Sequence, residues 1–213
     1  MGQIKKAVLA HAAFAAATIG VVAIAGGGLT GEERYIPERD VAQPTEAEAM
    51  ACWEQSATLG KPHLFLKPFV GTWDTKMRMW MDPSAPPMED AGTATFALVL
   101  GGRFVKQDFA GSMMGMPFEG VGYTGYDNMR KQYVSSWMDS MSTVMLTMQG
   151  NLDAKGNVLT QIGHMDEPTT GEINKAYKWV TTWVDDDTFT FGAYEILYGE
   201  GVKVFEIEYK RKK

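Results

Sequence analysis

An acidic and an aromatic side chain that could anchor a ligand lie two residues apart, at Trp137 and Asp139. Residues at every second position of a β-strand share a face, so both side chains would point to the same side of a sheet. A carboxylate on an inward, apolar face must be paired or protonated, and Arg103 is the partner that we predict for Asp139. Two interpretations stay open: the pair anchors the polar head of a ligand, or it is an internal ion pair that fixes strand register.

Methionine is frequent, with 15 residues in a chain of 213. Three groups stand out, one at every second position, one in a glycine-flanked stretch and one farther along the chain: Met77, Met79 and Met81; Met113, Met114 and Met116; and Met138, Met141, Met145 and Met148. Thioethers fill irregular apolar space, adapt to varied guests and also bind Cu(I). The spacing favours core packing first, pocket lining second and copper third. The residues assigned to a predicted ligand pocket are Met77, Met79, Arg103, Tyr126, Trp137 and Asp139.

The three histidines, His11, His63 and His164, are far apart in the sequence and lack the spacing of a metal site. His63 lies between an expected helix and the first expected strand, where a hydrogen bond that pins the helix is the favoured role. The sequence has no G-x-S-x-G motif, no Cys–His pairing in the strand region and no phosphate-binding glycine loop before a helix. We therefore assign no catalytic residue, no metal ligand and no cofactor. A reaction with Asp139 as acid or base stays a minor alternative.

From Phe69 onward the chain consists of short runs rich in Val, Thr, Phe, Tyr and Trp, separated by Gly, Pro, Asn and Asp. Ten strands are predicted, at 69–81, 91–100, 103–110, 117–127, 131–139, 142–150, 157–166, 175–184, 187–196 and 202–211. The connections are too short for crossover helices, so neighbouring strands should pair antiparallel. Because closure removes both exposed edges, the predicted fold class is an all-β, antiparallel up-and-down barrel of about ten strands.

One short helix is expected before the barrel, over residues 45–60, because Thr45 and Glu48 form a capping-box pattern. In the first strand, Trp73 and the residues alternating with it form an apolar face that must point into the barrel. Arg211 falls on the inward face at the end of the last strand, where the indole ring of Trp73 is a suitable partner for its charge.

Residues 1–25 carry two lysines, then an uncharged apolar stretch that ends in Ala23-Ile24-Ala25. This layout predicts a signal peptide cleaved after Ala25, and hence a periplasmic or secreted protein. An uncleaved membrane anchor over residues 7–25 is the competing interpretation. Residues 26–44 are expected to be a flexible leader, and residues 61–213 the barrel domain.

The formal net charge is −6, and no basic cluster occurs between the first residues and the last four, which disfavours nucleic-acid binding. The single cysteine, Cys52, cannot close an intrachain disulfide. The expected partner is a small apolar molecule, and the oligomeric state does not follow from the sequence.

Two resemblances refine this interpretation. Gly71-Thr72-Trp73 at the start of the first strand, with a basic residue closing the last, resembles the lipocalin and calycin barrels, which implies that the Trp plugs one barrel end beneath the basic side chain. From His63 to Arg211 the chain also resembles the bacterial secreted family called domain of unknown function 1579. The matching stretches are His63-x5-Phe69-x-Gly71-x-Trp73, Leu100-Gly101-Gly102-Arg103-Phe104, Pro117-Phe118-Glu119-Gly120, Gly125-Tyr126-Asp127, Trp137-x-Asp139 and Gly150.

That family resemblance implies a calycin-like barrel and brings no settled activity. The predicted function is therefore an exported barrel that binds a small, mainly apolar ligand in its interior. The alternative is a periplasmic protein that handles copper or haem through Met and His residues.

Overall fold

The computed structural model describes residues 44–197 and 200–213, so the predicted signal peptide and all but the last residue of the predicted leader lie outside it. In the described residues, one α-helix, α2, spans Glu46–Ala57. The carboxylate of Glu48 accepts hydrogen bonds from the backbone N–H and the hydroxyl of Thr45, both at 2.8 Å. The Thr45 hydroxyl in turn accepts from the Glu48 N–H at 3.3 Å, so the helix begins with a capping box.

A 3-10 helix, η1, spans Lys61–Phe69 and stands where the first strand was predicted to begin. Pro62 and Pro68 have no N–H to donate to a sheet ladder, which favours a helical segment over a strand here. The prediction that the first strand starts at residue 69 was therefore wrong by two residues. The short helix ends in Phe69, whose side chain is buried.

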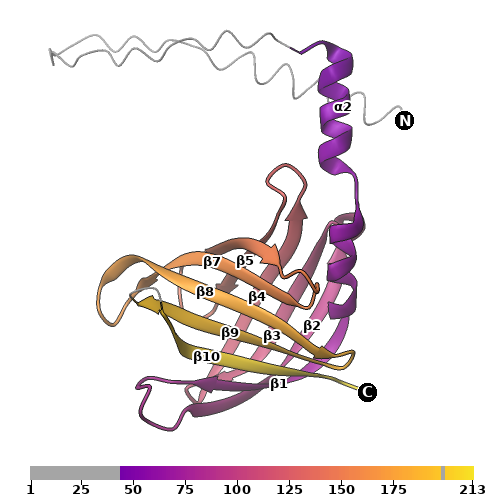
Figure 1. The fold of residues 1–213 in the computed structure, drawn as a ribbon. Coiled ribbons are helices and arrows are strands. Elements are labelled where there is room, and N and C mark those ends of the chain that lie inside the picture. Colours follow the sequence, from indigo (N-terminus) through magenta and orange to yellow (C-terminus); the bar gives the residue numbers. More distant parts are fainter. Residues whose placement is uncertain (1–43, 198–199) are drawn as a thin grey trace, which may run out of the picture. The chain divides into compact units, whose positions relative to one another are not determined.

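Ten strands follow: β1 (Gly71–Met79), β2 (Met88–Val99), β3 (Phe104–Met113), β4 (Met116–Asp127), β5 (Gln132–Asp139), β6 (Leu146–Leu152), β7 (Val158–Glu167), β8 (Glu172–Asp185), β9 (Thr188–Leu197) and β10 (Glu200–Arg211). A short turn, η2 (Leu100–Gly102), joins β2 to β3. Each strand pairs antiparallel with its neighbours in the chain, and β1 pairs with β10 to close the barrel (Figure 1). The predicted all-β up-and-down barrel is confirmed.

Inward and outward faces alternate along β1 as expected. Trp73, Thr75 and Met77 are buried, whereas Asp74 and Lys76 are exposed. Parts of β6, β7 and β8 alternate in the same way, whereas a bulge between Lys203 and Phe205 interrupts the period of two in β10.

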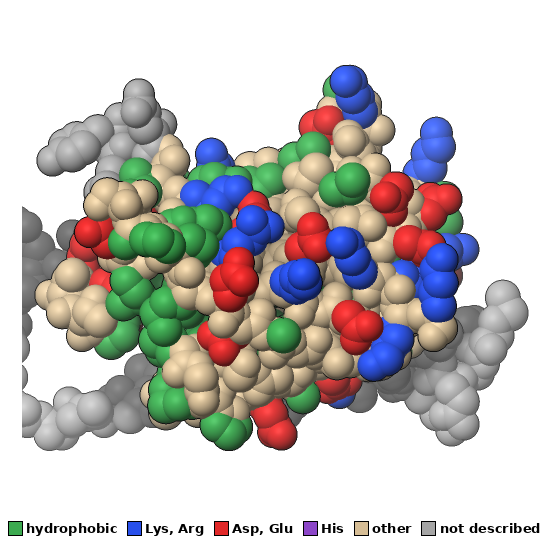
Figure 2. Space-filling view, turned by 90° about the horizontal axis from the view of Figure 1, so that it is seen from below, with side chains coloured by type: hydrophobic (Ala, Val, Ile, Leu, Met, Phe, Trp, Pro, Cys, Tyr) green, Lys and Arg blue, Asp and Glu red, His purple; other side chains and the backbone are tan. Residues whose placement is uncertain are grey.

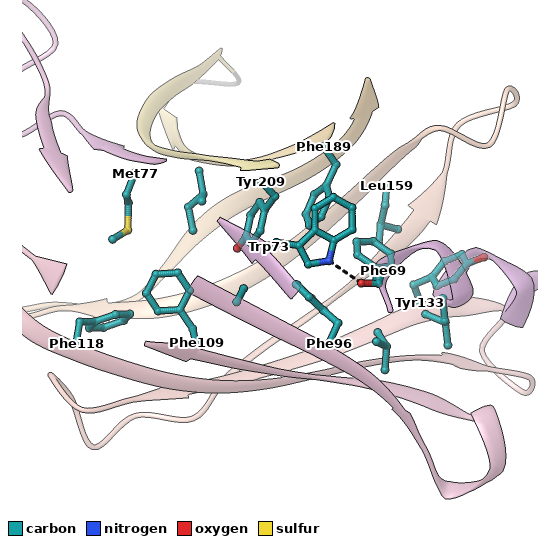
Figure 3. Close-up of a cluster of buried hydrophobic side chains, with 14 residues drawn as sticks. Phe69, Trp73, Met77, Phe96, Phe109, Phe118, Tyr133, Leu159, Phe189 and Tyr209 are labelled. Carbon is teal, nitrogen blue, oxygen red and sulfur yellow. Dashed lines mark hydrogen bonds between the residues drawn. The ribbon is translucent and has the colours of Figure 1, made fainter. Parts of the chain in front are cut away.

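Five aromatic side chains fill one end of the barrel, which we call the closed end: Phe69, Trp73, Phe96, Phe189 and Tyr209 (Figure 3). The Phe189 ring lies 4.8 Å from that of Trp73 and 4.2 Å from that of Tyr209, centroid to centroid. The Trp73 indole is fully buried and donates a hydrogen bond to the Phe69 carbonyl at 2.8 Å. The end of η1 is therefore fixed to the start of β1.

Arg211 covers the outer side of Trp73, with its guanidinium carbon 4.1 Å from the ring centroid. Its Nη1 donates to the Val70 carbonyl at 2.9 Å, and its Nε donates to Asp187 at 3.0 Å. Gly71 has a φ of 133°, and a Cβ there would lie 3.0 Å from Arg211 Nη1. Only glycine accepts that backbone conformation readily and also leaves room for the guanidinium group.

Candidate functional site

A cavity of about 660 Å³ occupies the barrel interior beyond the closed end. Its lining reaches from Phe69 and Phe96 at the closed end to Met81 and Thr170 in the connections at the opposite end. Met81 and Thr170 are exposed, so the cavity reaches the surface at that end. We call this end the mouth; the connections around it that the structure describes in full are β1–β2, β3–β4, β5–β6 and β7–β8.

Aromatic rings line the cavity wall instead of filling its centre. A Cβ at Gly120 would lie 2.2 Å from the Trp137 ring, and one at Gly122 would lie 2.9 Å from it, so the indole lies flat over two glycines of β4. The Phe109 ring lies over Gly92 in the same way, because a Cβ at Gly92 would lie 2.6 Å from that ring. Aromatic rings of neighbouring strands thus lie in the space that a larger side chain would take at these glycines, and the barrel centre stays open.

Seven methionines contribute to the lining: Met77, Met79, Met81, Met113, Met114, Met148 and Met165. Most of the remaining wall is aromatic or aliphatic. Thioether side chains are flexible and polarizable, so this wall can adjust to apolar molecules of different shapes.

A polar group interrupts the apolar wall halfway along the barrel. The Gln161 side chain is buried and donates to the Ser135 hydroxyl at 3.0 Å, which lies 2.9 Å from the Thr124 hydroxyl. On the facing wall, Gln107 donates to the Tyr209 hydroxyl at 3.2 Å. These amide and hydroxyl groups are satisfied mainly by one another, so they add little charge to the cavity.

Trp179 also lines the cavity, and its buried indole N–H has no acceptor among the described residues. A buried donor without a partner costs roughly 1–3 kcal/mol. This N–H lies beside Gly163, where a Cβ would be 3.3 Å from the nitrogen.

Four acidic or basic side chains line the cavity near the mouth: Asp139, Glu167, Lys175 and Glu195. Lys175 pairs with Glu195 at 2.8 Å and also with Glu172 at 3.2 Å. Its side chain is only 12% exposed, and the hydrogen bond to Glu195 raises its pKa. The ammonium group is thus engaged by two carboxylates of the protein itself.

Asp139 and Glu167 accept hydrogen bonds only from neutral donors. Trp137 Nε1 donates to Asp139 at 3.0 Å, and the Met141 N–H donates to its other oxygen at 3.0 Å. Glu167 accepts from the Thr169 hydroxyl at 2.6 Å and from the Tyr177 hydroxyl at 3.3 Å. The Thr169 hydroxyl, followed by its N–H, holds the pKa of Glu167 below the usual value, and burial raises the pKa of Tyr177 to about 12.

Hydrophobic side chains continue from the cavity onto the rim of the mouth. Met81, Met116, Met145 and Ile173 are 49–72% exposed and lie on or beside the connections named above. Figure 2 shows hydrophobic side chains gathered at the left end of the barrel in that view, with Lys, Arg, Asp and Glu spread over the rest of the visible face. An apolar molecule would meet apolar surface before it enters the cavity.

A carboxylate holds one hairpin at the mouth in place. Met114 and Gly115 form the β3–β4 turn with φ of 54° and 70°, the positive values of a type I′ turn. Asp90 accepts from the Ser112 hydroxyl and the Met114 N–H, each at 2.7 Å, and from the Gly115 N–H at 3.3 Å. The hydrogen bond from Ser112 is the main reason that the Asp90 pKa lies below its ordinary value.

Four of the six residues assigned to a ligand pocket from sequence line this cavity: Met77, Met79, Trp137 and Asp139. Tyr126 does not line it; its ring instead lies 5.7 Å from that of His63 and 5.0 Å from that of Tyr133. Gln161, Lys175 and Glu195 were missed. Strand alternation could have placed them inward, but they carry no motif.

The predicted ion pair between Arg103 and Asp139 is wrong. Arg103 is exposed in the turn after η2, where it donates to the carbonyls of Leu100 and Ala57 at 3.2 Å and 2.9 Å. Leu100, Gly101 and Gly102 all have positive φ, which turns the chain before β3 begins at Phe104. Arg103 therefore lies outside the strand that was expected to direct it inward.

Neither histidine of the described residues lines the cavity. His63 is buried in η1, where its Nδ1 accepts from the Gly60 N–H at 3.0 Å and so caps this 3-10 helix. His164 is exposed on β7. Within residues 44–197 and 200–213, no group of three or more His, Cys, Asp or Glu side chains is arranged to hold a metal ion. No helix in this part of the chain is long and apolar enough to cross a bilayer.

The molecule is thus a closed, ten-stranded up-and-down β-barrel with an apolar cavity that reaches the surface at one end. The chain belongs to the family described as protein of unknown function (DUF1579), whose profile matches residues 58–211. No curated protein matches this chain.

Solved structures share the barrel at low sequence identity. Rv2717c from M. tuberculosis aligns with a TM-score of 0.52 and 16% identity, over 73% of this chain and 100% of that one. The S-type phycobiliprotein lyase CPES from Guillardia theta aligns with a TM-score of 0.49 and 11% identity, over 72% of this chain and 94% of that one. A redesigned β-barrel aligns with a TM-score of 0.37 and 13% identity, over 70% and 95%. The likeness to Rv2717c shows the fold alone.

Proposed function

We propose that the barrel binds a small, mainly apolar molecule in its interior. The observation that carries this proposal is the cavity of about 660 Å³, which is walled by methionine and aromatic side chains and reaches the surface at the mouth. Ligand pockets in proteins typically measure ~300–1,000 Å³, are mostly apolar and contain a few placed polar groups. The cavity meets each of these criteria.

The wall supports a binding role over a purely structural one. A barrel of this size can fill itself with large side chains, and the closed end does so. Towards the mouth, Gly120 and Gly122 instead let Trp137 lie against the wall. This arrangement gives up packing in the centre, which a guest would restore.

A direct test looks for the guest. The full-length protein is produced in a bacterial host and purified without detergent, and native mass spectrometry compares the intact mass with that of the protein after denaturation and solvent extraction. We expect an adduct of a few hundred daltons and an extracted molecule of low polarity. Intact and denatured masses that agree, together with an empty extract and no binding of added apolar molecules, would contradict the proposal.

We also propose that the protein is exported. The support is the pattern of residues 1–25, with two lysines, an apolar stretch and Ala23-Ile24-Ala25 before Gly26. Fractionation of cells that produce the full chain, followed by N-terminal sequencing, should find a periplasmic or secreted protein that begins at Gly26. A protein that keeps residues 1–25 and stays in the membrane fraction would support the anchor instead.

A further inference from the structure

The charges around the mouth are unequal. Of the four side chains lining the cavity that are charged at pH 7, three are carboxylates and one is an ammonium group, so their formal sum is −2. Lys175 is already paired with Glu195 and Glu172. An anionic guest would have to displace these carboxylates to reach the ammonium group.

Asp139 and Glu167 are in the opposite situation. No Lys or Arg of the described residues lies within ion-pair distance of either carboxylate, and their hydrogen bonds come from indole, hydroxyl and backbone N–H groups. Charge–charge interactions are stronger beside an apolar cavity than in bulk water, and hydrogen bonds that involve a charged group are stronger than neutral ones. A cation or a strong donor that reaches the mouth would therefore meet two carboxylates without a direct ion pair, of which Glu167 also feels the charge of Lys175 at longer range.

The position of these carboxylates suits an elongated guest. Both line the cavity where β5 and β7 end, while the inner wall is apolar apart from the neutral groups around Gln161. A molecule with an apolar body directed towards the closed end would place its polar end beside Asp139 and Glu167. A carboxylate at that polar end would instead meet like charges.

We infer that the guest of this barrel is an amphiphile whose polar end is cationic or rich in hydrogen-bond donors, held at the mouth by Asp139 and Glu167, and that fatty-acid-like anions are disfavoured. This inference rests on the proposed function, because it concerns the ligand class of the same cavity.

The test compares three probes with one apolar chain: dodecylamine, dodecanol and dodecanoate. Each displaces a neutral fluorescent probe, N-phenyl-1-naphthylamine, from the full-length protein at pH 7 and low salt, below the aggregation concentration of the amphiphile. Dodecylamine should displace the probe at a concentration roughly tenfold lower than dodecanoate, with dodecanol between them. The ratio should fall as salt is added, because the carboxylates at the mouth are partly screened.

Variants test whether Asp139 and Glu167 cause the preference for dodecylamine over dodecanoate. In Asp139→Asn/Glu167→Gln the ratio between dodecanoate and dodecylamine should fall to about twofold or less, while dodecanol is unaffected. The control is Glu119→Gln, which removes an exposed carboxylate of β4 that does not line the cavity and should keep the ratio.

The outcomes distinguish failure of this inference from failure of the proposed function. Equal displacement by the three amphiphiles, or tighter binding of dodecanoate, overturns this inference and leaves the proposed function standing. A preference for dodecylamine that survives in the double variant also overturns it, because the named carboxylates are then not its cause. If N-phenyl-1-naphthylamine and all three amphiphiles fail to bind, the proposed function is contradicted and the inference with it.

Discussion

The two ends of the barrel use the same residue types in opposite ways. At the closed end, the Phe189 ring packs between those of Trp73 and Tyr209. Towards the mouth, the ring of Trp137 contacts the backbone of β4 over Gly120 and Gly122. The comparison teaches that aromatic content does not decide whether a small barrel is solid or hollow. At Trp137 the difference comes from the neighbouring strand, because Gly120 and Gly122 have no side chain in the space that the ring occupies.

The largest expected difference between the two ends concerns their tryptophans. Trp73→Ala removes a fully buried side chain and its hydrogen bond to Phe69, and should lower the free energy of unfolding by about 3–5 kcal/mol. Trp137→Ala should cost about half as much, because that indole already borders an open cavity. Urea denaturation of both variants measures the two values. Equal losses would mean that the two ends are packed alike.

The next effect sharpens the role of the strand glycines. In Gly120→Val, the new side chain occupies the space of the Trp137 ring, which must move into the cavity. We expect a loss of about 1–3 kcal/mol in stability from overpacking, together with weaker binding of an apolar probe. Ala110→Val, on the exposed face of β3, is the matched control and should change neither quantity. Unchanged probe binding in Gly120→Val would show that Trp137 does not bound the binding site.

A smaller change separates stability at the closed end from binding at the mouth. Arg211→Lys keeps the charge but loses the planar group that donates to Val70, Pro68 and Asp186 while it covers Trp73. The expected cost is about 1–2 kcal/mol in urea denaturation, with probe affinity unchanged. A loss of probe affinity as large as the loss of stability would show that the two ends are coupled.

The smallest effect is a pH dependence at the mouth. The pKa of Asp90 is lowered in the folded protein, chiefly by Ser112, so this carboxylate stabilises the fold above its ordinary pKa of 3.8 and loses that contribution as the pH falls through the lower folded value. Wild type should therefore be more stable than Asp90→Asn at pH 7, and this difference should shrink below about pH 3.8. Urea denaturation at pH 7 and pH 3 compares them. A difference that grows in acid would contradict the assignment.

The fold could be predicted because its determinants are local. Turn residues separate the strands, and alternation along β1 directs Trp73, Thr75 and Met77 inward whatever the neighbouring strand is. The prediction failed for Arg103, where three consecutive residues of positive φ move the side chain out of the strand. Nothing in the residue types of that turn specifies this conformation for Leu100.

The site was harder to predict because it depends on which strands pair and in which register. That Trp137 lies over Gly120 and Gly122 follows from the pairing of Gly122 with Trp137, which alternation within one strand does not reveal. The pairing of Lys175 with Glu195 likewise joins two strands through their register. The volume of the cavity depends on many such cross-strand pairs. The sequence could therefore indicate an apolar lining, but it could not show whether the interior is open.

The central claim is that the interior accepts a guest, and the titration of a neutral fluorescent probe into three forms of the full-length protein tests it most directly. Ala193 is buried on the cavity wall, and Ala193→Phe adds a ring to the lumen, whereas Ala110→Phe adds the same ring to the outer face of β3. We predict saturable binding of one probe per chain in wild type and Ala110→Phe, and affinity at least roughly tenfold lower in Ala193→Phe. Absence of saturable binding in wild type, or equal affinity in a folded Ala193→Phe, would contradict the account.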